Sequence, residues 1–154
     1  MFKKFLVATD GSKLAQDSAR GAIALAKASG AGVVGFFAAP AYHLPIYNDM
    51  AYAPVIAPEG DFNKHTAQMA KKYLGALEKM AKTAGVEFAG HTLASDQPAL
   101  AIIAAAKSEH CDMICVGSHG HGSVAQVLLG SVATKVLSLC DIPVLVHRAR
   151  HAGK

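Results

Sequence analysis

The chain has 154 residues, of which 52% are hydrophobic and 17% charged, and its formal net charge is +4 at pH 7. This length suits one domain with a buried core and excludes a disordered chain, while the longest apolar run, residues 99–106, is far shorter than the roughly 20 residues of a membrane-spanning helix. The basic residues stand singly or in pairs with no run of four, so we expect solvated surface charge rather than a nucleic-acid-binding stripe.

The first part of the chain alternates between apolar runs and helical patterns. A continuous apolar run over residues 5–9 predicts a buried strand, and Ser12 is placed to cap a helix that Gly30 ends. A second apolar run predicts a buried strand over residues 33–39. Residues 40–58, which are rich in proline and tyrosine, then predict a long surface loop of the kind that often carries function.

The same alternation continues to the end of the chain. Apolar residues at helical spacing predict a long amphipathic helix over residues 59–84, ended by Gly85. The strand that follows, over residues 86–93, is less apolar than the others, which places it near a sheet edge. The remaining predicted elements are an alanine-rich helix, a fourth strand, a short helix and a last strand, over residues 97–110, 113–116, 130–139 and 143–147.

Regular alternation of strands and helices is typical of a three-layer α/β/α fold with a parallel sheet, here of five strands. We predict one domain over residues 1–148, followed by a short basic tail over residues 149–154. Open sheets of this class bind ligands beyond the carboxyl ends of their strands, where the strand order reverses. The turns after the first and fourth strands are therefore the expected flanks of a site.

The turn after the fourth strand is rich in glycine. Gly117, Gly120 and Gly122 fall within six residues, and Gly130 opens the next helix. Glycine lets main-chain N–H groups approach a ligand closely, and a helix N-terminus adds partial positive charge. Residues 130–132 supply free N–H groups and a hydroxyl at that terminus. The pattern predicts a phosphate cradle made of main chain.

Spacing excludes two familiar phosphate loops. Gly117 and Gly122 have the separation of a Walker A loop, but Ser123 stands where the lysine is needed. No Gly-x-Gly-x-x-Gly follows the first strand, so a nicotinamide-dinucleotide fingerprint is missing as well. Ser131 has no evident base beside it, and we assign no catalytic residue.

The turn after the first strand reads Thr9-Asp10-Gly11-Ser12. An acidic side chain at the end of the first strand, across from a phosphate cradle, suits a ribose hydroxyl or a bound Mg²⁺ ion. Capping of the first helix is an equally good interpretation of Asp10 from the sequence alone.

The other potential metal ligands give weaker signals. Cys111 and Cys115 have no second pair nearby, so we interpret them as buried thiols rather than zinc ligands. For His119 and His121 we favour phosphate contact or solvent exposure over metal binding. An odd cysteine count and a start without the apolar stretch of a signal peptide predict reduced thiols and a cytoplasmic protein. Four scattered histidines are expected at the surface: His43, His65, His91 and His110.

Taken together, these motifs resemble the universal stress protein family. Gly117-x-x-Gly120, followed after nine residues by Gly130-Ser131, is similar to that family's ATP-binding motif. The two ends of the chain and the fourth strand with its loop also resemble the family, over residues 7–12, 142–146 and 112–120. The resemblance spans about residues 2–148, essentially the whole chain.

The resemblance implies a Rossmann-like fold, similar to the adenine nucleotide alpha-hydrolases, with strand order 3-2-1-4-5 and a homodimer formed through the last strand. It also implies a site for ATP or a related adenine nucleotide, with Asp10 at the ribose or at Mg²⁺ and main chain near Ala38 at the adenine. The residues implied to contact the nucleotide are Thr9, Asp10, Ala38, Val116, Gly117, His119, Gly120, Gly130, Ser131 and Val132.

Three functions remain open at this point. The favoured one is a stress-response sensor or regulator that binds an adenine nucleotide, ATP, AMP or a cyclic nucleotide, with little turnover. The second is a slow Mg²⁺-dependent ATPase or a self-phosphorylating protein, with Ser131 or Ser123 as acceptor. The third is a dimeric interaction scaffold whose site stays empty.

Overall fold

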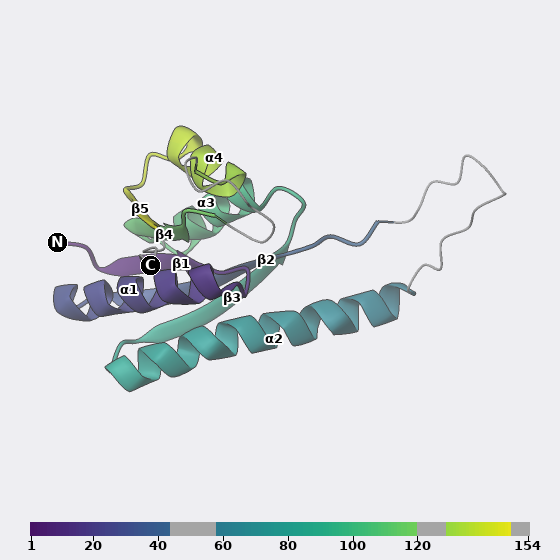
Figure 1. The fold of residues 1–154 in the computed structure, drawn as a ribbon, viewed down its shortest axis with the longest axis horizontal. Helices are drawn as coiled ribbons and strands as arrows, with labels where there is room; N and C mark the ends of the chain where they lie inside the picture. The colour runs from purple at the N-terminus through teal and green to yellow at the C-terminus, as the bar shows by residue number, and fades with distance from the viewer. Residues whose placement is uncertain (44–57, 120–128, 149–154) are drawn as a thin grey trace, which may run out of the picture.

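Five strands form one parallel sheet in the order β3-β2-β1-β4-β5, which confirms the expected strand order (Figure 1). The computed structural model describes residues 1–43, 58–119 and 129–148. The predicted basic tail, most of the predicted loop over residues 40–58, and the residues Gly120, His121, Gly122 and Ser123 lie outside the described residues. The strands are β1 (Lys4–Ala8), β2 (Gly32–Ala39), β3 (Phe88–Ala94), β4 (Met113–Gly117) and β5 (Val144–His147).

The central strand β1 is buried on both faces because its apolar run is continuous. Leu6 pairs with Val34 of β2 on one side and with Ile114 of β4 on the other. Phe5, Leu6 and Val7 are each 0% exposed, and truncation of such a side chain to alanine costs about 2–5 kcal/mol. Since β1 lies between β2 and β4, the strand order reverses there, at the turns that the sequence singled out.

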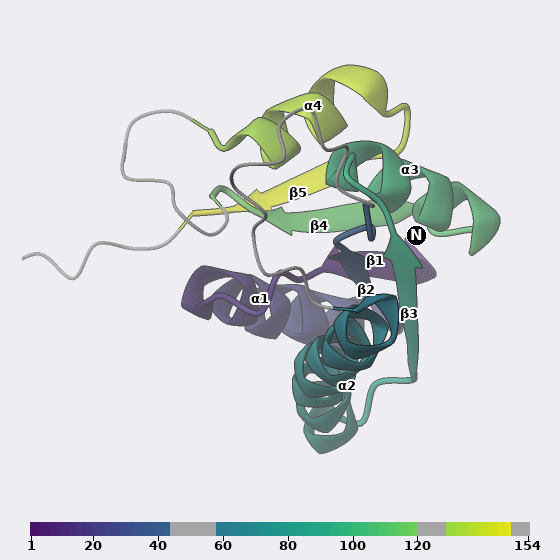
Figure 2. The same ribbon diagram turned by 90° about the vertical axis from the view of Figure 1, so that its right-hand side faces the viewer.

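Four helices cover the two faces of the sheet. Figure 2 shows α1 (Lys13–Ser29) and α2 (Glu59–Ala84) on one face, and α3 (Pro98–Ser108) and α4 (Ser131–Leu139) on the other. The first pair of helices packs on Phe5 and Val7, whereas the second pair packs on Leu6. None of the helices in the described segments is long and apolar enough to span a membrane.

Helix α1 shows how local sequence sets these elements. The side chain of Ser12 accepts a hydrogen bond from Ala15 N at 3.1 Å and caps the helix, and Gly30 ends it with φ of 68°. On the buried face small residues such as Ala19, Ala22 and Ala26 are at most 1% exposed, so the helix can lie close to the sheet. The start and the end of α1 were both predictable from these residues.

Two element boundaries differ from the sequence prediction by two residues, and several others differ by one. The third strand begins at Phe88 rather than at residue 86, because Val86 N donates to Ala81 O at 2.9 Å and so closes helix α2. Helix α3 ends at Ser108 rather than at residue 110, because His110 takes φ of 54° and turns the chain. The exposed strand β3 does lie at a sheet edge, as its polarity predicted.

Candidate functional site

The turn after β1 is a tight, internally bonded loop. Thr9 N donates to Phe36 O at 2.9 Å, Gly11 N donates to Thr9 Oγ1 at 3.1 Å, and Ser12 N donates to Asp10 Oδ1 at 2.9 Å. Gly11 has φ of 80°, a conformation that favours glycine. The helix cap belongs to Ser12, so Asp10 stabilises the turn itself instead of capping α1.

The turn after β4 is tied to two other elements through Ser118. Ser118 N donates to His147 O of β5 at 2.8 Å, and Gly130 N donates to Ser118 O at 2.6 Å. The Ser118 side chain is 2% exposed, and its Oγ lies 3.0 Å from Nδ1 of His119. These contacts hold the end of β4 next to β5 and next to the start of α4.

The start of α4 presents main-chain N–H groups at this end of the sheet. The first N–H groups of a helix have no acceptor within the helix, and the N-cap Gly130 makes no side-chain hydrogen bond to them. Ser131 is exposed at this terminus, while Val132 and Ala133 pack the helix onto the core. The helix end therefore combines a partial positive charge with an accessible surface.

His119 carries a buried nitrogen without a partner. Its Nδ1 faces Ser118, whereas its Nε2 is buried and lies within hydrogen-bond distance of no residue that the structure describes. An unsatisfied buried polar group costs about 1–3 kcal/mol. Solvent exposure, one of the two expectations for this side chain, therefore does not hold at Nε2, and a ligand oxygen there would relieve the cost.

Most of the residues predicted for the site lie at the same edge of the sheet. Thr9 and Asp10 follow β1, and Val116, Gly117 and His119 lie at the end of β4, its direct neighbour. Gly130, Ser131 and Val132 join them through the hydrogen bond between Gly130 and Ser118. Gly120 lies outside the described residues.

Ala38 lies near the end of β2, the other neighbour of β1. It is partly buried and packs, like Ala8 and Val132, against the apolar cluster that contains Val116. The carboxyl ends of β1, β2 and β4 thus share an apolar wall on the face covered by α3 and α4.

Two residues that shape this edge were not predicted to be part of the site. Ser118 stands between the motif residues Gly117 and His119. Its importance for the turn becomes apparent only from its burial and its three hydrogen bonds. Tyr73 of α2 lies against Gly11, across 62 positions of sequence that carry no signal for this contact.

Cys111 and Cys115 are buried, and the four scattered histidines are exposed, as predicted. Burial raises the pKa of the Cys111 thiol to about 11 and that of Cys115 to about 12, which keeps both protonated and unreactive. Within the described part of the chain, no three His, Cys, Asp or Glu residues cluster as metal ligands. The four histidines expected at the surface are exposed: His43, His65, His91 and His110.

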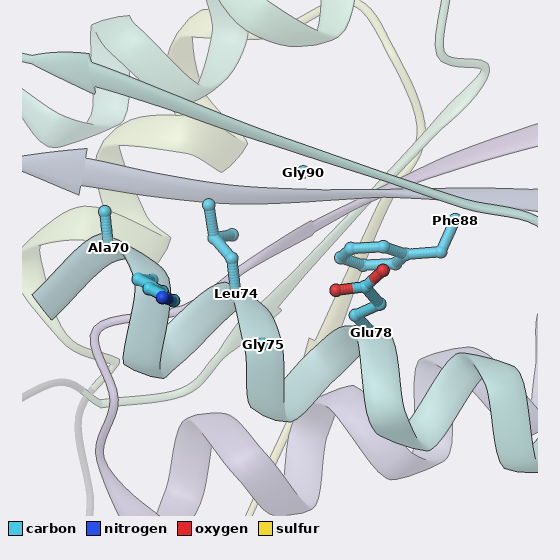
Figure 3. A pocket seen from close by; sticks show the side chains of 7 residues that line it. Ala70, Leu74, Gly75, Glu78, Phe88 and Gly90 are labelled. Atoms are coloured by element: carbon cyan, nitrogen blue, oxygen red, sulfur yellow. The ribbon is translucent and has the colours of Figure 1, made fainter. Parts of the chain in front are cut away.

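A separate hollow of about 460 Å³ lies between α2 and β3 (Figure 3). Gly75 and Gly90 leave room in it, and the carboxylate of Glu78 lies beside the ring of Phe88. The hollow shares no residue with the turns after β1 and β4. Its lining has one cation, Lys71, and no helix N-terminus, so it lacks the chemistry of a phosphate site.

The sheet order, which reverses between β1 and β4, defines a doubly wound α/β protein. Residues 1–148 match the model of the Universal stress protein family, and the chain belongs to that family.

Individual relatives agree with this assignment. A universal stress protein of Thermus aquaticus, encoded in the QAH/OAS sulfhydrylase 3′ region, is 34% identical over 152 residues, which cover 96% of this chain and 100% of the relative. A universal stress protein solved in complex with cAMP superposes with a TM-score of 0.71 at 24% identity, over 95% of this chain and 97% of the other. One from Archaeoglobus fulgidus, in complex with dAMP, gives 0.66 at 20% identity, over 95% and 97%.

Proposed function

We propose that this protein binds an adenine nucleotide in the crevice between β1 and β4, and acts in the cytoplasm as a stress-response regulator with little turnover. One observation carries the proposal: the N-terminus of α4, whose N-cap Gly130 has no side chain to cap it, is held at the end of β4 by the 2.6 Å hydrogen bond from Gly130 N to Ser118 O. Beside it, His119 Nε2 is buried without a partner among the described residues. The cAMP and dAMP complexes of structurally similar proteins support the choice of an adenine ligand.

Each part of a nucleotide finds suitable groups in the crevice. The N–H groups of Ser131 and Val132 and the Nε2 atom of His119 would receive phosphate oxygens. The carboxylate of Asp10 would accept from a ribose hydroxyl or hold Mg²⁺, which neutralises phosphate charge when bound. The apolar wall near Ala38 would lie against the base.

The proposed fit of the nucleotide also depends on Gly117, at the end of β4. A methyl group at Gly117 would lie 3.4 Å from the carbonyl oxygen of His119 and 3.5 Å from Cγ of Leu14. It would therefore fill the space that remains beside the turn. A side chain at Gly130 would project where the backbone approaches phosphate.

Calorimetric titration with ATP, AMP and cAMP, each with and without Mg²⁺, tests the proposal. We expect the double variant Gly117→Ala/Gly130→Ala to weaken nucleotide affinity by about 10-fold or more. Gly75→Ala is the matched control, because a methyl group there meets no atom within 4 Å and lies outside the crevice. Failure of the folded wild-type protein to bind any of the three nucleotides, or unchanged affinity in the double variant, would contradict the proposal.

We also propose that two copies pair through β5. This strand is an edge of the sheet, and its Leu145 side chain is 37% exposed. The carbonyl oxygens of Pro143 and His147 accept from β4 and the residue that follows it, so the peptide groups of the alternating residues 144 and 146 face outward. Such an edge is available to a second strand.

A further inference from the structure

Ser118 makes polar contacts both through its main chain and through its side chain. Its main-chain N–H and C=O join β5 to the start of α4, and these bonds are available to any residue. Its side chain makes a separate contact, because the buried Oγ lies 3.0 Å from Nδ1 of His119. The geometry of the turn therefore does not depend on the hydroxyl, which instead contacts the imidazole of His119.

We propose that Ser118 is a positioning residue that fixes the tautomer of His119, so that Nε2 carries the proton and donates to an anionic oxygen of the bound nucleotide. The inference rests on the proposed function and deepens it, since it gives the atom that donates and the residue that prepares it. Ser118 does not itself touch the ligand in this assignment.

The chemistry of the two side chains leads to this direction. A neutral imidazole has one N–H donor and one acceptor nitrogen, and a serine hydroxyl can either donate or accept. When the hydroxyl donates to Nδ1, the proton of the ring resides on Nε2. In the opposite tautomer Nε2 would present a buried lone pair, which repels an anionic oxygen.

A bound anion would favour the tautomer with the proton on Nε2. Nδ1 and Nε2 are separated by Cε1 and point in diverging directions in the plane of the ring, so Nε2 is directed away from Ser118. Ser118 O accepts the hydrogen bond from Gly130 N and so holds the N-terminus of α4. His119 is the next residue in the chain and therefore lies close to that terminus. That terminus attracts an anion, and a neutral N–H donor beside it adds to the attraction without a charged side chain.

Nuclear magnetic resonance of ¹⁵N-histidine-labelled protein tests the assignment through the protonation of each His119 nitrogen. In the wild-type protein we expect Nε2–H with Nδ1 unprotonated, both free and with AMP bound. Ser118→Ala removes the hydroxyl but keeps both main-chain bonds, and we expect it to yield a mixture of tautomers. Ser118→Thr keeps a hydroxyl and should restore the wild-type pattern.

Calorimetry with AMP and ATP measures the consequence for binding. We expect Ser118→Ala to weaken affinity by about 5-fold to 10-fold, a change of about 1–1.4 kcal/mol. In the background of His119→Gln, whose side-chain amide donates without tautomers, the same substitution should have little effect. Ser138→Ala, which removes an exposed serine hydroxyl at the far end of α4, is the control and should bind as the wild type does.

The outcomes separate this inference from the proposed function. A wild-type protein that binds AMP with His119 protonated at Nδ1, or a Ser118→Ala variant with unchanged tautomer and affinity, overturns the inference alone. A wild-type protein that binds no adenine nucleotide overturns the proposed function and the donor role together. In that case, the tautomer observed in the free protein still tests whether Ser118 fixes the tautomer of His119.

Discussion

The ring of Tyr73 lies directly against Gly11, so that a methyl group at Gly11 would be only 2.2 Å from Cε1 of the ring. Tyr73 also makes an edge-to-face contact with Phe37, whose ring centroid is 5.2 Å away. Helix α2 thereby packs onto the turn that carries Asp10. Gly11 is required there for two independent reasons, its φ of 80° and this close approach.

A pair of glycine variants separates the two reasons. Gly30 also has a positive φ, 68°, but a methyl group there meets no atom within 4 Å. We expect Gly30→Ala to cost about 1 kcal/mol of unfolding free energy from conformation alone, and Gly11→Ala about 2–4 kcal/mol because the ring must also move. Urea unfolding of both variants measures the difference. Equal costs would show that Tyr73 does not restrict the turn. When combined with Gly11→Ala, Tyr73→Leu should recover part of the stability that Gly11→Ala loses.

The buried thiol of Cys115 makes the free energy of unfolding depend on pH in the alkaline range. Burial raises its pKa from 9.0 to about 12, so above pH 9 the unfolded chain loses a proton that the folded protein keeps. The stability that this thiol contributes is complete below the unfolded pKa and falls by up to about 1.4 kcal/mol per pH unit as the pH rises toward the folded value.

Urea unfolding of the wild type and of Cys115→Ala, at about pH 8 and about pH 10, tests this linkage. The alanine variant is less stable at the lower pH because it leaves a cavity, and we expect the gap to narrow at the higher pH. Lysine and tyrosine titrations are common to both proteins and cancel in the comparison. A stability difference of constant size between the two proteins would mean that the thiol ionises equally in the folded and unfolded states.

Local patterns were sufficient to predict the helices and strands of the fold. The continuous apolar run around Leu6 predicts a strand with both faces covered, and the polarity of residues 86–93 predicts an edge strand. Ser12 and Gly30 mark the ends of α1 because capping depends on residues that are neighbours in sequence. The order of the strands came from the resemblance and not from these patterns.

The details of the site could not be predicted in this way. The contact of Tyr73 with Gly11 joins two elements that are distant in sequence, and no periodicity encodes it. The burial of Ser118 depends on β5 and α4 meeting at the end of β4, so a serine in a glycine-rich turn gives no local sign of it. Val86 also lacked a local signal, since it closes a helix although its side chain favours a strand.

The proposed pairing through β5 predicts different effects at the two edges of the sheet. Leu145 on β5 is 37% exposed and Leu93 on β3 is 50% exposed, so either position accepts a lysine at little cost in folding. We expect Leu145→Lys to shift the protein from dimer to monomer in sedimentation equilibrium, because charge on an edge strand opposes pairing. Leu93→Lys should leave the dimer intact. A monomeric wild-type protein at high micromolar concentration would contradict the pairing.

A negative charge at the start of α4 should move stability and binding in opposite directions. Ser131 is exposed at the helix N-terminus, where a carboxylate interacts favourably with the helix dipole. We therefore expect Ser131→Asp to raise the unfolding free energy by about 0.5 kcal/mol, yet to weaken nucleotide affinity by about 10-fold or more, because the carboxylate competes with phosphate for the same N–H groups. Urea unfolding and calorimetry give the two values.

Ser138→Asp places the same charge in the last turn of the same helix and serves as the control. There the dipole has the opposite sign, so the variant should lose about 0.5 kcal/mol of stability and keep its affinity for nucleotide. A Ser131→Asp protein that binds nucleotide as tightly as the wild type would show that phosphate does not reach the end of α4. The anion would then have to be held by the turn after β4 alone, where His119 Nε2 is the remaining buried donor or acceptor without a partner among the described residues.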